Sequence, residues 1–449
     1  MGVRFLHAAD LHLGSPLESV TDKQRTDELH RATHDALKRI ISLAIDREVE
    51  FVVVSGDLYD KRARSVEAND FLVQQFERLN ERDVPCYIVH GNHDPLYDGA
   101  ERLDWPENVH VFSADGVEII EHPGEEHTTA RLLGQSYGQQ WVSETLSDEY
   151  TPPDSTVPNI GLLHTGLNPD GRKYAPCSPS DLAAKEIDYW ALGHIHTPGR
   201  IAGANAAYAG IPQGRHIGEA GVGGCYIVEV EPNASPELAF LPTSPVVWHE
   251  IEIDIGTAKT GDGKQVGTLS ELVSCVVDRC QEVRNTGYTE LAERVLDVPV
   301  SDVEWEPTGV IFRLNLVGRG AVHDQLDEEA IPWLQTQIGE RLPSGTSTVW
   351  IESIRDRTSP PLPDDETLRE EDETIDELHA LVEELRTQQE VQQDLRETVG
   401  EVWEWTPAEE TEDLPEDRLV LNEDRLDDLI DSALRRATDR IALEHYNVD

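Results

Sequence analysis

The sequence predicts a layered α/β fold for residues 1 to about 240, and three observations indicate it. Five short runs rich in Val, Ile, Leu or aromatic residues have the length of buried strands. Amphipathic stretches with apolar residues at helical spacing lie between the first three of these runs. Polar residues then cluster directly after the runs. Short strands that alternate with helices are typical of a sheet covered by helices.

The predicted elements follow one another along the chain. The five strands cover residues 3–6, 51–54, 87–89, 160–163 and 189–192. A helix is expected within residues 22–46, where apolar residues recur at helical spacing. A second helix is expected over residues 65–80, with Phe71, Leu72, Phe76 and Leu79 on one face. That face is either part of the core or the contact of a homodimer, and both interpretations remain open.

Residues 241–357 have a different pattern, in which strands and helices alternate singly. The order strand, helix, strand, helix, strand is expected at residues 246–255, 269–282, 309–317, 328–338 and 348–354. It predicts a small α+β accessory domain after a main domain of residues 1–240. Three prolines, Pro360, Pro361 and Pro363, mark residues 358–365 as a linker.

The C-terminal region, residues 366–449, is strongly acidic, and two helices are predicted there at about residues 368–399 and 422–445. The second helix carries an apolar stripe that includes Leu426, Leu429, Ile430 and Leu434. This stripe is too narrow to stabilise an isolated helix, so it packs either on its own chain or on another protein. An acidic segment ahead of an amphipathic helix favours the second interpretation, a tethered docking helix.

Composition excludes some classes of protein. The chain has 449 residues, and 37 Lys plus Arg against 88 Asp plus Glu give a net charge of −51. No apolar run approaches the roughly 18 to 20 residues that a membrane-spanning helix needs. No signal peptide is visible, so we expect a cytoplasmic protein with no membrane segment. Five cysteines without a CxxC pair argue against a disulfide framework and against a structural zinc site.

The charge also bears on the substrate. A net charge of −51 should repel nucleic acid at ordinary ionic strength. Lysine is scarce, with seven residues, while Asp and Glu are abundant, which is typical of halophiles that accumulate salt. At molar salt the Debye length is only about 3 Å, so the overall field is screened. The acidity therefore does not exclude DNA as a substrate.

Side chains that can bind metal ions follow each of the five predicted strands. In chain order they are Asp10 and His12, then Asp57 and Asp60, then Asn92, His93 and Asp94, then His164, and finally His194 and His196. The carboxyl ends of the strands form the ligand-binding edge of an open α/β sheet, so these segments should meet at one rim. Carboxylate, imidazole and amide ligands without thiolate suit Mn, Fe, Zn or Co. Two cations about 3.5 to 4 Å apart need a bridging carboxylate, and Asp57 is the natural bridge.

Seven motifs resemble those of a known family, the calcineurin-like metallophosphoesterases. They are LHAADLHLGSPL, GDLYD, VHGNHDP, LLHTG, YAPCSPSDL, DYWALGHIHTP and GIPQGRHIGE. More narrowly, they are similar to DNA repair exonucleases of the SbcD and YhaO-like type, relatives of the nuclease subunit of archaeal and eukaryotic break-resection complexes. The resemblance implies a two-sheet αββα sandwich with a dinuclear metal centre, followed by a smaller accessory domain that caps DNA and a helical acidic C-terminal arm.

The resemblance also implies a role for each motif residue. Asp10, His12, Asp57 and His196 would hold the first metal ion, and Asp57, Asn92, His164 and His194 would hold the second. The implied cofactor is two Mn²⁺, with other divalent metals left open. His93 would protonate the leaving oxygen as general acid, and Asp60 would orient His93. The implied reaction is phosphodiester hydrolysis by an exonuclease in DNA end processing and double-strand break repair, with single-strand endonuclease activity left open.

The implied partners are DNA and a coiled-coil ATPase of the SbcC or YhaN-like type, bound by the C-terminal helix. Two other functions remain open. One is a two-metal phosphoesterase acting on nucleotides or small phosphate esters, because one fold serves many substrates. The other is a DNA-tethering scaffold with an idle site. The accessory domain and C-terminal arm weigh against the former, and the complete set of ligands weighs against the latter.

Basic residues near the rim are candidate DNA contacts. They are Lys61, Arg62, Arg64, Arg172, Lys173 and Arg215. Contact with the phosphate backbone would position DNA without reading its sequence. The alternative, a solvated loop that balances nearby carboxylates, remains open. His216, in the motif GRHIGE, is a further open candidate for the active site.

Overall fold

A computed structural model gives the architecture of the chain. It describes residues 2–15, 17, 31–60, 65–97, 103–124, 128–153, 156–167, 173–301, 303–342, 348–361, 365–387 and 423–446. The chain forms two compact units. The first comprises Met1–Ile251, Asp278–Arg313 and Gly339–Ser353, and the second comprises Glu252–Val277, Leu314–Ile338 and Ile354–Asp449.

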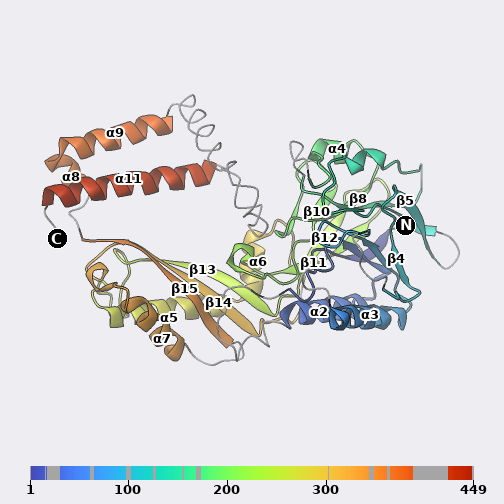
Figure 1. The fold of residues 1–449 in the computed structure, drawn as a ribbon, viewed down its shortest axis with the longest axis horizontal. Coiled ribbons are helices and arrows are strands. Elements are labelled where there is room, and N and C mark those ends of the chain that lie inside the picture. Colours follow the sequence, from blue (N-terminus) through green and yellow to red (C-terminus); the bar gives the residue numbers. More distant parts are fainter. Residues whose placement is uncertain are drawn as a thin grey trace. The chain divides into compact units, whose positions relative to one another are not determined.

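The first unit contains two six-stranded sheets (Figure 1). The first sheet has the order β12 (Glu237–Pro242), β11 (Gly224–Val230), β1 (Val3–Ala8), β2 (Phe51–Ser55), β3 (Cys86–Val89) and β4 (Val109–Val111). The second has the order β5 (Glu118–Pro123), β6 (Thr128–Gly134), β7 (Asn159–His164), β8 (Tyr189–Gly193), β10 (Ala206–Tyr208) and β9 (Gly199–Arg200). Strands β1 to β4 run parallel to one another, as do β6, β7, β8 and β10. The carboxyl ends of each parallel set therefore lie on one edge.

Alternate residues of the buried strands face different layers, as the two-residue repeat of a strand requires. In β2, Phe51 and Val53 belong to a core shared by both sheets, whereas Val52 and Val54 belong to a core shared with helices. In β8, Tyr189 and Ala191 lie in the core shared by the sheets, and Trp190 and Leu192 in a third core on the outer face of the second sheet. Both faces are covered, which explains why these strands are continuous apolar runs.

Helices cover the outer face of the first sheet. They are α2 (Ala32–Asp46) and α3 (Val66–Asn80), and the side chain of Ser65 caps α3 by accepting a hydrogen bond from the backbone N–H of Ala68. Leu72, Phe76 and Leu79 of α3 are buried in this core. The apolar face predicted for residues 65–80 thus packs within the chain, and a homodimer remains a prediction. The short helix α4 (Pro179–Ala183) contributes Leu182 to the core on the second sheet. The predicted α/β fold with two sheets is confirmed.

The predicted accessory pattern is present in its predicted order, with one additional helix. Strands β13 (Val246–Asp254), β14 (Gly309–Arg319) and β15 (Thr348–Ser359) form a sheet in that order, and each strand contributes residues to both units. The helices are α5 (Leu269–Thr286), α7 (Ala330–Arg341) and the unpredicted α6 (Tyr288–Val295). On the sheet, the Arg313 guanidinium donates to both carboxylate oxygens of Glu352, at 2.9 and 2.7 Å.

In the second unit, three C-terminal helices pack together: α8 (Asp365–Glu371), α9 (Glu373–Thr387) and α11 (Glu423–Tyr446) (Figure 1). Ile430 is buried against Val382 of α9, and Leu434 packs beside them. Half of the predicted stripe thus packs on its own chain. The side chains of Leu426 and Leu429 lie outside the described residues, and docking on a partner remains a prediction. None of the helices in the described part of the chain is long and apolar enough to cross a bilayer.

Candidate metal centre

The residues predicted to bind metal follow the carboxyl ends of parallel strands in both sheets. Asp10 and His12 follow β1, Asp57 follows β2 and Asn92 follows β3; His164 ends β7, and His194 and His196 follow β8. The loops after β1 and β2 continue the pairing of their strands, because the N–H of Asp10 donates to Gly56 O and that of His12 to Asp57 O, both at 3.0 Å. Backbone pairing thus holds the two loops in register.

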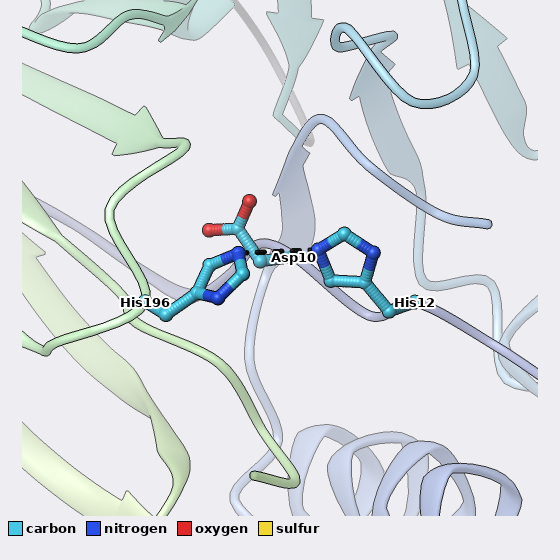
Figure 2. Close-up of side chains that lie close together, drawn as sticks. All are labelled: Asp10, His12 and His196. Carbon is cyan, nitrogen blue, oxygen red and sulfur yellow. Dashed lines mark hydrogen bonds between the residues drawn. The ribbon is translucent and has the colours of Figure 1, made fainter. Parts of the chain in front are cut away.

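One group of donors consists of Asp10, His12 and His196, whose ligand atoms lie within 4.8 Å of one another (Figure 2). His12 Nδ1 is 3.1 Å from Asp60 Oδ1, and His196 Nδ1 is 2.7 Å from Glu219 Oε1. In a neutral ring whose Nδ1–H donates to its carboxylate, Nε2 is left to bind a metal ion. The two Nε2 atoms face each other at 3.2 Å. These two nitrogens and the Asp10 carboxylate thus converge closely enough to bind one metal ion.

A second group of donors converges beside the first. Asn92 Oδ1 lies 2.9 Å from His164 Nε2 and 3.1 Å from His194 Nδ1. Asp57 Oδ2 is 3.3 Å from His164 Nε2 and 3.9 Å from His12 Nε2. One carboxylate oxygen of Asp57 therefore reaches a histidine nitrogen of each group, which is the position required of a bridging ligand.

Burial sets the electrostatics of the centre. Burial raises the pKa of Asp10 to about 7, because removal of the carboxylate from water destabilises its ionised form more than the nearby His196 and His164 stabilise it. Burial opposes ionisation of Asp57 too, but His164 and His93 outweigh it and hold the Asp57 pKa well below its usual range. These oxygen and nitrogen donors, with no thiolate, fit divalent cations such as Mn, Fe, Zn or Co. The donor set therefore fits a dinuclear divalent metal site.

The backbone at the centre is strained. Asp10, His12, Asp57 and His194 have φ angles of 51°, 40°, 52° and 105°, a region that non-glycine residues rarely adopt. Such conformations persist where the surroundings enforce them and cluster at functional sites. The neighbouring Gly56 has a φ of 97°, and a Cβ there would lie 2.3 Å from His164 Nδ1. The turn after β2 therefore requires glycine beside Asp57.

His93 lies at the rim of the centre. Its side chain is 39% exposed, whereas those of His12 and His164 are fully buried. His93 Nδ1 is 2.6 Å from Asp60 Oδ1, and its backbone N–H donates to Asp57 Oδ1 at 3.0 Å. Burial lowers the pKa of His93, but the carboxylates of Asp57 and Asp60 outweigh burial and raise it to about 9. The geometry leaves Nε2 as the nitrogen available to a substrate.

Two residues beside the proposed ligands, Arg215 and Glu219, connect the histidines of the centre through hydrogen bonds. Arg215 Nη1 donates to Asp60 Oδ2 at 2.8 Å and Nη2 donates to Glu219 Oε1 at 2.9 Å. Asp60 holds His12 and His93, and Glu219 holds His196, so the guanidinium links all three histidines through two carboxylates. We call Asp60, Arg215 and Glu219 the carboxylate–arginine brace.

The brace was only partly predictable. The sequence pattern did not single out Glu219, although its spacing of four residues from Arg215 in GRHIGE was a signal. The Arg215 side chain is only 15% exposed, and its charge is engaged by two carboxylates. Burial lowers the pKa of Arg215, but Glu219 and Asp60 outweigh burial and raise it. Its predicted contact with DNA is untested, and the structure places it behind the metal ligands.

The remaining candidates fall in different places. The predicted contacts Lys61, Arg62, Arg64 and Arg172 lie outside the described residues. Lys173 is exposed, with Nζ over the ring of Trp141 at 5.7 Å from its centroid. His216 Nε2 is 3.5 Å from Glu219 Oε1, so this open candidate touches the brace. Asp94 accepts hydrogen bonds from the backbone N–H groups of Leu58 and Gly91, which ties the loops after β2 and β3 together.

Comparison with known proteins agrees with this geometry. Residues 3–198 match the calcineurin-like phosphoesterase family. The chain is 33% identical over 298 residues to the uncharacterized metallophosphoesterase YhaO of Bacillus subtilis, an alignment that covers 65% of this chain and 71% of YhaO. It is 26% identical over 283 residues to the SbcD subunit of the nuclease SbcCD of Staphylococcus epidermidis, covering 56% of this chain and 72% of that protein.

The similarity to an archaeal relative covers a smaller part of both proteins. The DNA double-strand break repair protein Mre11 of Methanocaldococcus jannaschii is 30% identical over 202 residues, which are 43% of this chain. The match spans only 51% of the length of that Mre11 protein. The family match, the extent of the similarity to YhaO and the two converging groups of donors lead to one conclusion. The chain belongs to the calcineurin-like phosphoesterase family, as a metal-dependent phosphodiesterase of the type that includes SbcD and YhaO.

Proposed function

We propose that the protein is a manganese-dependent DNA nuclease that processes DNA ends in double-strand break repair. The observation that carries the proposal is the position of Asp57 Oδ2, within 4 Å of histidine nitrogens from both groups of donors, beside the pair of His93 and Asp60. In this proposal, the arrangement serves as two cation sites and a proton donor at one rim. The similarity to proteins named as a break repair protein and a nuclease subunit supports DNA as the substrate.

In this proposal, two groups of side chains hold two Mn²⁺ ions. Asp10, His12, Asp57 and His196 hold the first, and Asp57, Asn92, His164 and His194 hold the second. When bound, the cations would stabilise negative charge on the phosphate oxygens and lower the pKa of a nearby water molecule. The protein itself holds the donors in place through strained loops and buried hydrogen bonds, so little reorganisation is needed during the reaction.

His93 acts as general acid in this proposal. Hydrolysis breaks a P–O bond and releases a sugar hydroxyl, which is a poor leaving group unless it receives a proton. The hydrogen bond from Nδ1 to Asp60 fixes the ring and leaves Nε2–H to donate that proton to the leaving oxygen. Asp60 touches His93 and His12 and therefore acts as a positioning residue for both.

The assay compares substrates and variants of the full chain. End-labelled single-stranded DNA, end-labelled duplex and p-nitrophenyl phosphate are incubated with Mn²⁺ at high salt. The wild type is expected to shorten the DNA progressively and to hydrolyse the monoester poorly. His93→Gln should lower DNA cleavage by at least about 100-fold, within the range attributed to general acids. Asn92→Ala should lower DNA cleavage as well, because it removes a proposed ligand of the second metal ion. His110→Ala, at a half-buried histidine paired with Glu118, is the matched control.

Two outcomes would overturn the proposal. Rapid hydrolysis of p-nitrophenyl phosphate or nucleotides without DNA cleavage would identify a small-molecule phosphoesterase. No hydrolysis of any substrate, with DNA still bound, would identify a scaffold. Circular dichroism of each variant checks that the fold is retained, so that a loss of activity reports on the site.

We further propose that an SbcC-like ATPase is the partner, because the chain resembles a subunit of a protein named SbcCD. The C-terminal helices are the proposed docking element. Deletion of residues 415–449, which removes α11, should abolish co-purification with such an ATPase and leave manganese-dependent cleavage of single-stranded DNA intact. Retained co-purification would place the partner's contact elsewhere.

A further inference from the structure

Two aromatic side chains of the first unit are unusually exposed. Tyr97 is 59% exposed and Trp141 is 55% exposed, although large aromatic residues are mostly buried in folded proteins. Both lie on loops that follow parallel strands of the two sheets. Tyr97 is on the loop after β3, the loop that carries Asn92 and His93, and Trp141 is on the loop after β6.

Backbone hydrogen bonds join these two loops. The N–H of Tyr137 donates to His90 O at 3.0 Å, and the N–H of Leu96 donates back to Tyr137 O at 2.9 Å. The N–H of Tyr97 donates to Gly138 O at 3.3 Å. The ring of Tyr97 lies against Gly138, since a Cβ at Gly138 would be 3.0 Å from Tyr97 Cδ2. The Tyr97 ring and the segment leading to Trp141 are therefore neighbours.

The loop of Trp141 is also fixed to the metal centre. Tyr137, at its start, contacts the ring of His164 edge-on, with centroids 5.5 Å apart. At its end, Val142 pairs with the backbone on both sides of Tyr174, through Lys173 O and the N–H of Ala175, both at 2.8 Å. The ring of Tyr174 packs on His194 with centroids 4.6 Å apart. The Trp141 loop therefore reaches His164 through the ring of Tyr137, and it pairs with the segment whose Tyr174 ring contacts His194.

A positive charge accompanies the exposed rings. Lys173 Nζ lies over the ring of Trp141 at 5.7 Å from its centroid, within the range of a cation–π contact. The chain has only 37 basic residues against 88 acidic ones, so a lysine at this place is not explained by abundance. Tyr97 OH donates to Asp115 Oδ1 at 2.7 Å, which anchors the polar end of that ring. Exposed aromatic rings can stack on the bases of a nucleotide strand, and a lysine beside them can contact its phosphate groups.

We propose that Tyr97, Trp141 and Lys173 form a stacking surface for an unpaired nucleotide strand that enters the metal centre. In this assignment, which rests on the proposed nuclease function, Trp141 stacks on a base and Lys173 contacts the adjoining phosphate. Such surfaces bind single strands with little sequence preference, because every base has a π face. The proposal names unpaired DNA, at an end or in a frayed segment, as the form of substrate that the centre receives.

The test measures binding without cleavage. Anisotropy of a labelled oligo(dT) is titrated with the full chain in EDTA, at molar salt where phosphate contacts are weakened and stacking remains. Trp141→Leu should weaken binding by about tenfold or more, the effect expected from loss of one stacked base. Trp141→Phe should stay within about threefold of wild type, because it keeps a stacking ring. Leu381→Ala, at an apolar residue of α9 that is 54% exposed and carries no proposed DNA contact, is the control and should bind like wild type.

The outcomes separate the two proposals. An abasic oligonucleotide should bind more weakly than oligo(dT) and be insensitive to Trp141→Leu. If Trp141→Leu bound oligo(dT) like wild type, or if the abasic strand lost as much affinity as oligo(dT) in that variant, the stacking surface would be rejected. Cleavage of DNA by wild type with Mn²⁺ tests the nuclease function separately, so the surface can fail while the nuclease stands.

Discussion

Glu219→Gln is expected to weaken divalent cation binding by about 10 to 100-fold, although Glu219 is not a proposed ligand. The Glu219 side chain is 3% exposed and accepts from His196 Nδ1 at 2.7 Å, from Arg215 Nη2 at 2.9 Å and from the Arg215 backbone N–H at 2.6 Å. Burial raises the pKa of Glu219, but Arg215 and His196 outweigh burial and hold it well below its usual range. The group is therefore a buried carboxylate that accepts several hydrogen bonds from His196 and Arg215.

Glutamine has one carbonyl oxygen and a donating amide group, so it must turn that group toward at least one of these donors. The loss of one hydrogen bond to a charged group costs about 1.5 to 3 kcal/mol. Tenfold in affinity corresponds to about 1.4 kcal/mol, so this loss amounts to roughly 10 to 100-fold if it falls on His196 as a ligand. The same range is found for residues that orient metal-binding histidines in other proteins.

The assay is calorimetric titration of Mn²⁺ into the full chain after removal of metal with EDTA. Glu121→Gln, at an exposed carboxylate paired with Arg131, is the control and should bind Mn²⁺ like wild type. The double variant Arg215→Met with Glu219→Gln also removes the guanidinium, which in Glu219→Gln keeps only Asp60 as a carboxylate partner, and it should not recover Mn²⁺ affinity. Unchanged Mn²⁺ affinity and stoichiometry in a folded Glu219→Gln protein would refute the reasoning.

Three further outcomes are expected. Gly91→Ala should disrupt metal binding, because its Cβ would lie 2.2 Å from Asp57 Oδ1; normal Mn²⁺ affinity of the variant by calorimetry would contradict this. His7, fully buried, has a pKa lowered to about 3 by loss of hydration, so unfolded chains bind its proton first and the free energy of unfolding should fall by about 1.4 kcal/mol per pH unit below pH 6.5. Urea unfolding measures how far the free energy of unfolding falls between pH 7 and pH 5. This fall should be about 2 kcal/mol smaller in His7→Gln than in wild type, and an equal fall in both would contradict the prediction. Arg313→Met should lower the free energy of unfolding by about 3 to 5 kcal/mol, because it removes the guanidinium that neutralises the buried Glu352 carboxylate; Arg313→Met with Glu352→Leu should regain most of it, and failure to regain it would show that packing, not charge, is the cause.

The sequence predicted the parts of the fold in which local pattern and tertiary role coincide. The five predicted strands, β1, β2, β3, β7 and β8, all lie inside their sheets, where a strand buried on both faces is a continuous apolar run. The interior strands β6, β10 and β11 were not predicted. Edge strands such as β5 and the two-residue β9 alternate or are too short to give a pattern, so they were missed. The first predicted helix is present as α2 from Ala32 onward, and its expected earlier residues, 22–30, lie outside the described part of the chain.

The site shows the same division. Asp10, Asp57 and His164 were predictable because each comes directly after, or ends, a recognisable strand. The pairing within the brace was not predictable, although Asp60 and Arg215 were each named as candidates, because Arg215 meets Asp60 across 155 residues of sequence. Its partners are set by how the loops of both sheets come together, and no periodicity encodes that approach. Tyr97 and Trp141 were missed for a related reason, since exposure of a single aromatic residue cannot be read from pattern alone.

The proposed ligands come from both sheets, with Asp10, Asp57 and Asn92 from the first and His164, His194 and His196 from the second. A pair of ions in this position would link the two sheets to each other at one edge. Cation binding should then be coupled to global folding, adding about 2.7 kcal/mol when the free ion is at 100 times its dissociation constant. The melting temperature should accordingly rise with Mn²⁺ concentration. Removal of the metal would then lower the stability of the fold as well as the activity.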